Sequence, residues 1–167
     1  MSDVNDLLSK RLSLVQEPSS QSPNQGVPKT GEQLFEEALV LYNNNQYEES
    51  ANLIMTGIIT SQTELKSSLH GQFYELLIQC TNDNDKYDEC DKVSLLVDYY
   101  KKAGKAFHTN QDLLKSILYY TKSLELYQNN KFLSTITKLN PIPNIAKQIG
   151  ELYTLLKDYN NALTYYK

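Results

Sequence analysis

Apolar residues recur every three or four positions from Gly31 onward, which is the spacing of one face of an α-helix. Leu34, Ala38 and Leu41 begin the pattern, and no segment shows the alternation of a β-strand. Runs of Asn and Asp interrupt it, as do Pro141 and Pro143, because these residues favour turns over helix interiors. The pattern therefore predicts an all-α chain. The expected helices cover about 31–42, 47–60, 65–80, 86–108, 112–128, 144–156 and 159–167.

The first 30 residues differ from the rest of the chain. Residues 16–30, QEPSSQSPNQGVPKT, contain three prolines and few apolar side chains, so they cannot bury enough surface to offset the loss of conformational entropy. Residues 1–15 have a faint helical spacing, which fits a frayed tail better than a short docking helix. We therefore expect a disordered tail over 1–30 and a helical domain over 31–167.

Three copies of one pattern lie within the helical domain. Each copy has a small residue, a large residue three positions later and, after a turn, a second small residue and a second large one. Two antiparallel helices pack closely only where small residues meet at their crossing, so each copy predicts a helical hairpin. The copies read Ala38-x2-Leu41-x5-Tyr47-x2-Ser50-x3-Ile54-x2-Gly57, Gly104-x2-Phe107-x5-Leu113-x2-Ser116-x3-Tyr120-x2-Ser123 and Gly150-x2-Tyr153-x5-Tyr159-x2-Ala162-x3-Tyr166.

This pattern resembles the tetratricopeptide repeat, whose signature is a small residue, an aromatic residue three positions on, and a later Ala-x3-aromatic. Gly71-x2-Tyr74 supplies the first half of a further copy, and the small residues at 38, 71 and 104 are 33 positions apart, close to the family period of about 34. The step to Gly150 is 46, which predicts an insertion near 130–143. The family's usual early Trp and closing Pro are absent.

The resemblance implies antiparallel helix-pair repeats that form a short right-handed α-solenoid. Its repeats would lie near 31–60, 65–92 (degenerate), 95–128 and 143–167. A helical bundle without repeats is the alternative.

Two narrower resemblances concern parts of the chain. Residues 103–127 and 145–167 are similar to the middle of the soluble NSF attachment proteins, which are adaptors that link SNARE complexes to a disassembly ATPase. Residues 31–95 do not share this likeness, and the family's membrane-touching loop and acidic C-terminal helix are missing. The chain is similar to the N-terminal repeats of anaphase-promoting-complex scaffold subunits to a comparable degree.

Composition and charge narrow the classes of function that the chain can have. The chain carries 16 Lys and Arg against 20 Asp and Glu, and a net charge of -4 disfavours nucleic-acid binding, which needs a basic face. No apolar run approaches the roughly 18 residues of a membrane span. Cys80 and Cys90 lack zinc spacing, His70 and His108 lack metal-spaced partners, and no phosphate loop or nucleophile elbow is present. We therefore expect no cofactor, no metal and no enzymatic activity, and a cytoplasmic location, with the nucleus as the alternative.

The tetratricopeptide resemblance also implies where a partner would bind. In that family the first helices of successive repeats line a concave groove, and the positions three before and one after the small residue face it. Lys101 and Lys105 are one helical turn apart and project together, which suits an acidic peptide or a carboxylate. The groove residues implied for this chain are Phe35, Leu39, Lys101, Lys105, Lys147 and Glu151.

These observations predict a protein-interaction scaffold or adaptor that binds an acidic or amphipathic peptide, or a partner helix, in the groove. The alternatives are a vesicle-trafficking adaptor of the attachment-protein kind and a scaffold subunit of a large complex. The last helix carries Tyr165 and Tyr166 and no polar capping helix follows it. Because an uncapped array exposes apolar surface, we expect a fragment of a longer array. The alternative is that the C-terminal end docks on a partner or on a second copy of the chain.

Overall fold

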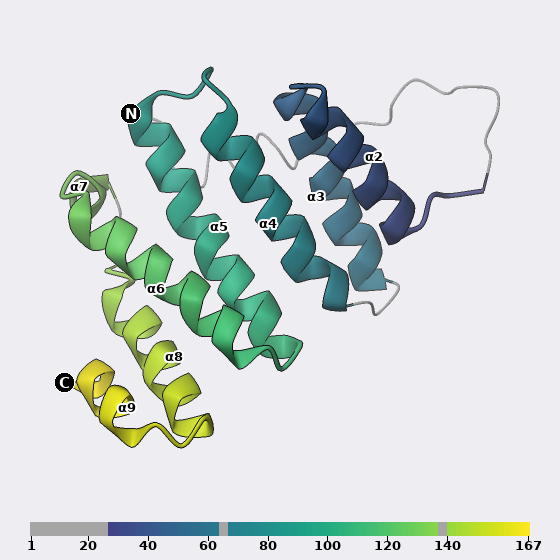
Figure 1. Cartoon of the computed structure of the whole chain (residues 1–167). Coiled ribbons are helices and arrows are strands. Elements are labelled where there is room, and N and C mark those ends of the chain that lie inside the picture. Colours follow the sequence, from purple (N-terminus) through teal and green to yellow (C-terminus); the bar gives the residue numbers. More distant parts are fainter. Residues whose placement is uncertain (1–26, 64–66, 137–139) are drawn as a thin grey trace. The chain divides into compact units, whose positions relative to one another are not determined.

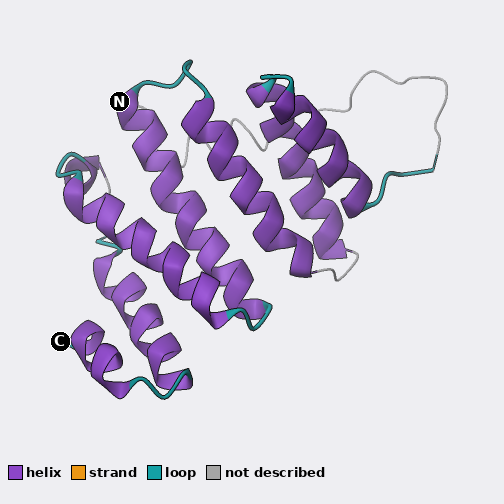
Figure 2. Cartoon of the chain, in the orientation of Figure 1, coloured by secondary structure: helices purple, strands orange, loops and turns teal. Residues whose placement is uncertain are grey.

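The computed structural model describes residues 27–63, 67–136 and 140–167 (Figure 1). These residues form eight helices and no strand, which confirms the predicted all-α class (Figure 2). The chain divides between Tyr87 and Asp88 into two compact units. The tail predicted over 1–30 lies outside the described residues, apart from 27–30.

The first unit consists of α2 (Gly31–Asn43), α3 (Tyr47–Thr63) and α4 (Ser67–Asp83). A capping box starts α2, since Thr30 Oγ1 accepts a hydrogen bond from the Gln33 amide and the Gln33 side chain accepts one from the Thr30 amide. α2 and α3 form a hairpin, and α4 packs mainly on α3. The Tyr42 hydroxyl, on α2, donates to Asp83 Oδ2 at 2.5 Å and so joins α2 to the end of α4. This hydrogen bond is the main reason that the pKa of Tyr42 is raised to about 12.

The core of the first unit forms where α3 crosses α4. A Cβ atom added to Gly57 would lie 2.3 Å from the Phe73 ring, so only glycine leaves room for that ring. The Phe73 and Ile54 side chains are fully buried. Phe35, on α2, contacts Phe73 edge to face, with 5.4 Å between ring centroids.

The second unit consists of α5 (Glu89–Thr109), α6 (Leu113–Asn129), the short α7 (Leu133–Ile136), α8 (Ile142–Leu155) and α9 (Tyr159–Tyr166). α5 pairs with α6, α8 pairs with α9, and α6 also packs against α8. α7 falls in the insertion predicted near 130–143, and its Leu133 is buried against Val93 and Tyr127. The region 65–92, predicted as a degenerate repeat, holds α4, the loop after it and the first residues of α5.

α8 begins at Ile142, slightly earlier than the sequence predicts, and Pro143 lies in its first turn. A proline is tolerated there because the amides of the first turn have no helical carbonyl to bond. The prolines therefore mark the start of a helix here as well as a break before it.

The hairpins α2–α3, α5–α6 and α8–α9 close with the same turn. In each turn, a residue in the left-handed region follows the first helix. The amide of the residue after it donates a hydrogen bond, at 2.9 Å, to the carbonyl of the residue five positions before the donor. This hydrogen bond satisfies a carbonyl that the end of the helix would otherwise leave without a partner. The left-handed residues are Asn45, Gln111 and Lys157, with φ of 61°, 64° and 62°. The donor–acceptor pairs are Gln46–Leu41, Asp112–Phe107 and Asp158–Tyr153.

The small residues of the sequence pattern lie at the helix crossings. Ser50 Oγ donates to the Ala38 carbonyl, and Ser116 Oγ donates to the Gly104 carbonyl, both at 2.7 Å and both buried. In the second unit an aromatic ring fills the space beside each glycine. A Cβ atom on Gly104 would lie 2.8 Å from the Tyr120 ring, and one on Gly150 would lie 2.9 Å from the Tyr166 ring.

His70, on α4, is partly buried against α3. Burial lowers its pKa below the usual value, although a hydrogen bond to the Ile58 backbone acts in the opposite direction. Its Nε2 atom is buried without a hydrogen-bond partner among the described residues, so protonation would bury an extra N–H group.

None of the described helices combines the length and the apolar composition that crossing a bilayer requires.

We predict that Gly104→Ala destabilises the chain and that Gly150→Ala does not, although the two contact distances are nearly equal. Tyr120 is 4% exposed and packed in the α6–α8 core, whereas Tyr166 is 52% exposed and can turn aside. Each alanine gains about 1 kcal/mol of helix propensity, but overpacking a buried site costs roughly 1–3 kcal/mol. Urea unfolding should show a loss of stability for Gly104→Ala and no loss for Gly150→Ala. Equal shifts of the same sign would contradict this account of the crossings.

We predict that His70 makes the first unit less stable in mild acid. Its folded pKa lies below its unfolded value of about 6.5, so the unfolded chain binds the proton first as the pH falls. The contribution of neutral His70 to the free energy of unfolding is therefore present above pH 6.5 and is lost as the pH falls toward the folded pKa. Urea unfolding at pH 7.5 and 5.5 should show a larger loss for the native chain than for His70→Gln. Equal losses would show that another group is responsible.

Candidate binding cavity between α5 and α8

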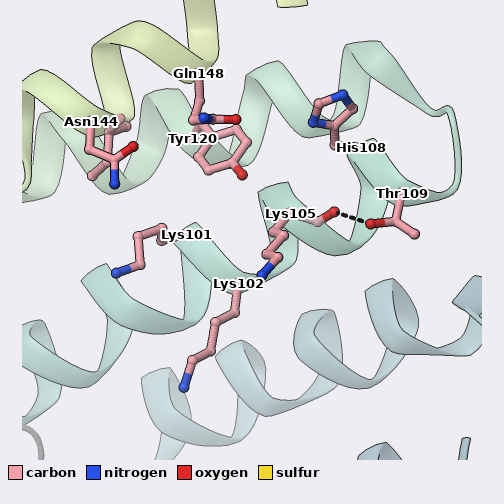
Figure 3. Close-up of a pocket in the computed structure, with 9 residues that line it drawn as sticks. Lys101, Lys102, Lys105, His108, Thr109, Tyr120, Asn144 and Gln148 are labelled. Carbon is pink, nitrogen blue, oxygen red and sulfur yellow. Dashed lines mark hydrogen bonds between the residues drawn. The ribbon is translucent and has the colours of Figure 1, made fainter. Parts of the chain in front are cut away.

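A cavity of about 420 Å³ lies within the second unit, between α5 and α8 (Figure 3). α5 and α8 are the first helices of the two hairpins of this unit, and both contact α6. The volume lies in the range that binding sites for small ligands and side chains occupy, roughly 300–1,000 Å³. The cavity is therefore a product of how the hairpins stack within the unit.

The α5 wall of the cavity is cationic. Lys101, Lys105, His108 and Thr109 line it with the spacing of one helix face, and Lys102 lies beside them. Figure 3 shows the Thr109 hydroxyl donating to the Lys105 carbonyl, at 3.0 Å, which fixes the Thr109 side chain against its own helix.

One carboxylate is tied to this wall. Lys102 Nζ lies 2.9 Å from Asp98 Oδ2, and Lys101 Nζ lies 3.9 Å from Asp98 Oδ1. The Asp98 side chain is only 16% exposed, whereas Lys101 and Lys102 remain 46% and 39% exposed. Asp98 therefore holds two lysine side chains near α5 but does not neutralise the wall.

The α8 wall is polar and uncharged. Asn144 and Gln148 are one helical turn apart and line the cavity with their amide side chains. Ile145, between them in sequence, is buried in the α6–α8 core and fixes this face of α8. Figure 3 shows the two amides on the side of the cavity opposite Lys101 and Lys105.

Tyr120, on α6, lies between the two walls (Figure 3). Its ring packs beside Gly104, and its hydroxyl points toward the α5 side. Burial, and secondarily the negative charge of Glu151, raise the pKa of Tyr120 above its usual value of 10. The hydroxyl is therefore neutral at physiological pH, so it can donate a hydrogen bond to an anion.

The structure places the six predicted groove residues in three locations. Lys101 and Lys105 line the cavity. Lys147 and Glu151 lie on α8 but are not among the lining residues, and their charged groups are 3.8 Å apart. Phe35 and Leu39 belong to α2 in the first unit, where Phe35 packs on Phe73 and Leu39 is 39% exposed.

Six polar lining residues were not among those predicted: Lys102, His108, Thr109, Tyr120, Asn144 and Gln148. His108 and Thr109 lie seven and eight positions after Lys101, so helical spacing alone could have added them to the α5 wall. The α8 residues gave no such signal, because which face of α8 meets the cavity depends on how α8 packs on α6.

The described residues contain no group of three or more His, Cys, Asp and Glu side chains suited to a metal ion. In comparisons with known proteins, no family model matches this chain, and no curated protein sequence matches it.

We predict that Tyr120→Phe reduces the loss of stability in alkali. The pKa of Tyr120 is higher in the folded chain than in the unfolded chain. The contribution of the neutral hydroxyl to the free energy of unfolding is therefore present below pH 10 and is lost as the pH rises through the folded pKa. Urea unfolding at pH 8 and 10.5 should show a smaller loss for Tyr120→Phe than for the native chain. Glu151→Gln should lower the pKa of Tyr120, since it removes the nearby negative charge. If Tyr120→Phe lost as much stability in alkali as the native chain, the result would contradict the burial of the hydroxyl.

Proposed function

We propose that this chain is a protein-interaction scaffold or adaptor of the tetratricopeptide-like kind, which acts in the cytoplasm and catalyses no reaction. The observation that carries the proposal is the cavity between α5 and α8, where a cationic helix face lies opposite a row of amides. A partner with an acidic segment binds between these helices.

The shared geometry of the three hairpins supports a repeat relationship. Each hairpin closes with a left-handed residue and the same hydrogen bond across five residues, although the sequences of the turns differ. The serine-to-carbonyl hydrogen bond recurs at two of the crossings. Under this proposal the hairpins stack as a right-handed solenoid.

The groups in the cavity suit binding to an acidic segment. Ammonium groups and amides donate hydrogen bonds to carboxylates or phosphates, and charge-assisted hydrogen bonds are the stronger kind. The α5 residues lie on one helix, which sets the spacing of their Cα atoms before a partner arrives. This preorganisation reduces the entropy lost on binding.

We predict that charge reversal in the cavity abolishes partner capture. The tagged full chain would be used to capture proteins from its native cell extract, followed by mass spectrometry. Lys101→Glu with Lys105→Glu should reduce recovery of a specific partner at least about ten-fold, because both changes place negative charge in the cavity.

The matched control is Lys131→Glu with Lys167→Glu, which changes the net charge equally but alters neither a lining residue nor a predicted groove residue. Circular dichroism would first establish that both double variants fold. A partner recovered equally with both variants would show that another surface binds it.

A further inference from the structure

We infer that the cavity between α5 and α8 recognises a phosphorylated side chain, phosphoserine or phosphothreonine, on a partner protein. This inference rests on the proposed function, since it takes the ligand to be part of a protein partner.

The charge of the cavity matches a doubly charged anion. Lys101, Lys102 and Lys105 line it, and Asp98 is the carboxylate paired with two of them. Three positive charges against one negative charge leave a surplus of two among these four side chains. The negative charge of Glu151, which acts on Tyr120, is offset by Lys147 at 3.8 Å. A phosphoryl group carries about −1.5 to −2 at neutral pH, whereas a carboxylate carries a single charge. A carboxylate would therefore leave ammonium groups on this helix face without a counter-charge.

The hydrogen-bond donors that line the cavity also suit the three terminal oxygens of a phosphoryl group better than the two oxygens of a carboxylate. Lys101 and Lys105, one turn apart on α5, face Asn144 and Gln148, one turn apart on α8 (Figure 3). A group between the walls would accept hydrogen bonds from ammonium groups on one side and from amides on the other. The neutral Tyr120 hydroxyl supplies a further donor from α6. A planar carboxylate has only two oxygens to present to these walls.

The size of the cavity favours a phosphorylated peptide over a free phosphate ion. A volume of about 420 Å³ is several times that of a phosphoryl group, so an isolated ion would leave most of it filled with water. A phosphorylated residue with its neighbours would fill more of this space. The partly exposed stems of Lys101 and Lys102 offer apolar surface to those neighbours.

The test uses fluorescence anisotropy of the full chain with three short degenerate peptide libraries. The libraries are identical except at the central position, which is phosphoserine, serine or glutamate. We expect the phosphoserine library to bind at least about ten-fold more tightly than the other two at physiological salt. Inorganic phosphate serves as the competitor and should displace the peptides only at much higher concentration.

Two cavity variants and one control assign the binding to this site. Lys101→Gln with Lys105→Gln and, separately, Asn144→Ala with Gln148→Ala should each weaken binding about ten-fold. Lys131→Gln with Lys167→Gln removes as much positive charge as the first pair and should leave binding unchanged. The amide pair keeps the inference testable because it leaves every lysine in place and favours helix formation.

Each alternative outcome overturns the inference. Equal binding of the three libraries, with the same dependence on Lys101 and Lys105, would show a peptide site that does not read phosphate, and the proposed function would stand. Displacement by inorganic phosphate at the peptide's own concentration would show a site for the free ion. Binding that falls equally in the control variant would show general attraction to lysines. If no library binds, the inference fails and the capture experiment decides the proposed function separately.

Discussion

An aromatic ring in the space beside a glycine is the close contact at three helix crossings, those of α3 with α4, α5 with α6 and α8 with α9. Phe73 lies against Gly57, Tyr120 against Gly104 and Tyr166 against Gly150, and a Cβ atom at any of these glycines would come within 3 Å of the ring. The absence of a side chain lets the two helix axes approach, and the ring then fills the remaining volume. At Gly104 the same approach brings the Ser116 hydroxyl within 2.7 Å of the glycine carbonyl.

The same contact shapes the cavity. Tyr120 packs beside Gly104 with its ring and reaches the cavity with its hydroxyl, so one residue belongs to both the core and the candidate site. α6 carries Tyr120 and contacts both α5 and α8. The walls of the cavity are thus placed by the core of the second unit. A binding site on rigid helices loses little entropy when its ligand arrives.

The fold class and the approximate helix positions could be predicted because helical spacing is a local property of the sequence. The small and large residues of the three copies do lie at helix crossings, as Ser50 and Ser116 show. The buried position of Leu133 on α7 could not be predicted, since it depends on contacts with Val93 and Tyr127 from other helices. For the same reason Lys101 and Lys105 were found from their spacing on α5, whereas Asn144 and Gln148 required the packing of α8 on α6.

The ring that fills each glycine site comes sixteen residues after the glycine, at Phe73, Tyr120 and Tyr166 alike. Closing a loop of this length costs little chain entropy, and contacts between residues near in sequence form quickly. The helix pairs α3–α4, α5–α6 and α8–α9 can therefore each form this contact from their own residues. A lesion at one of these crossings removes a contact within its own helix pair and leaves the ring–glycine contacts of the other two pairs in place.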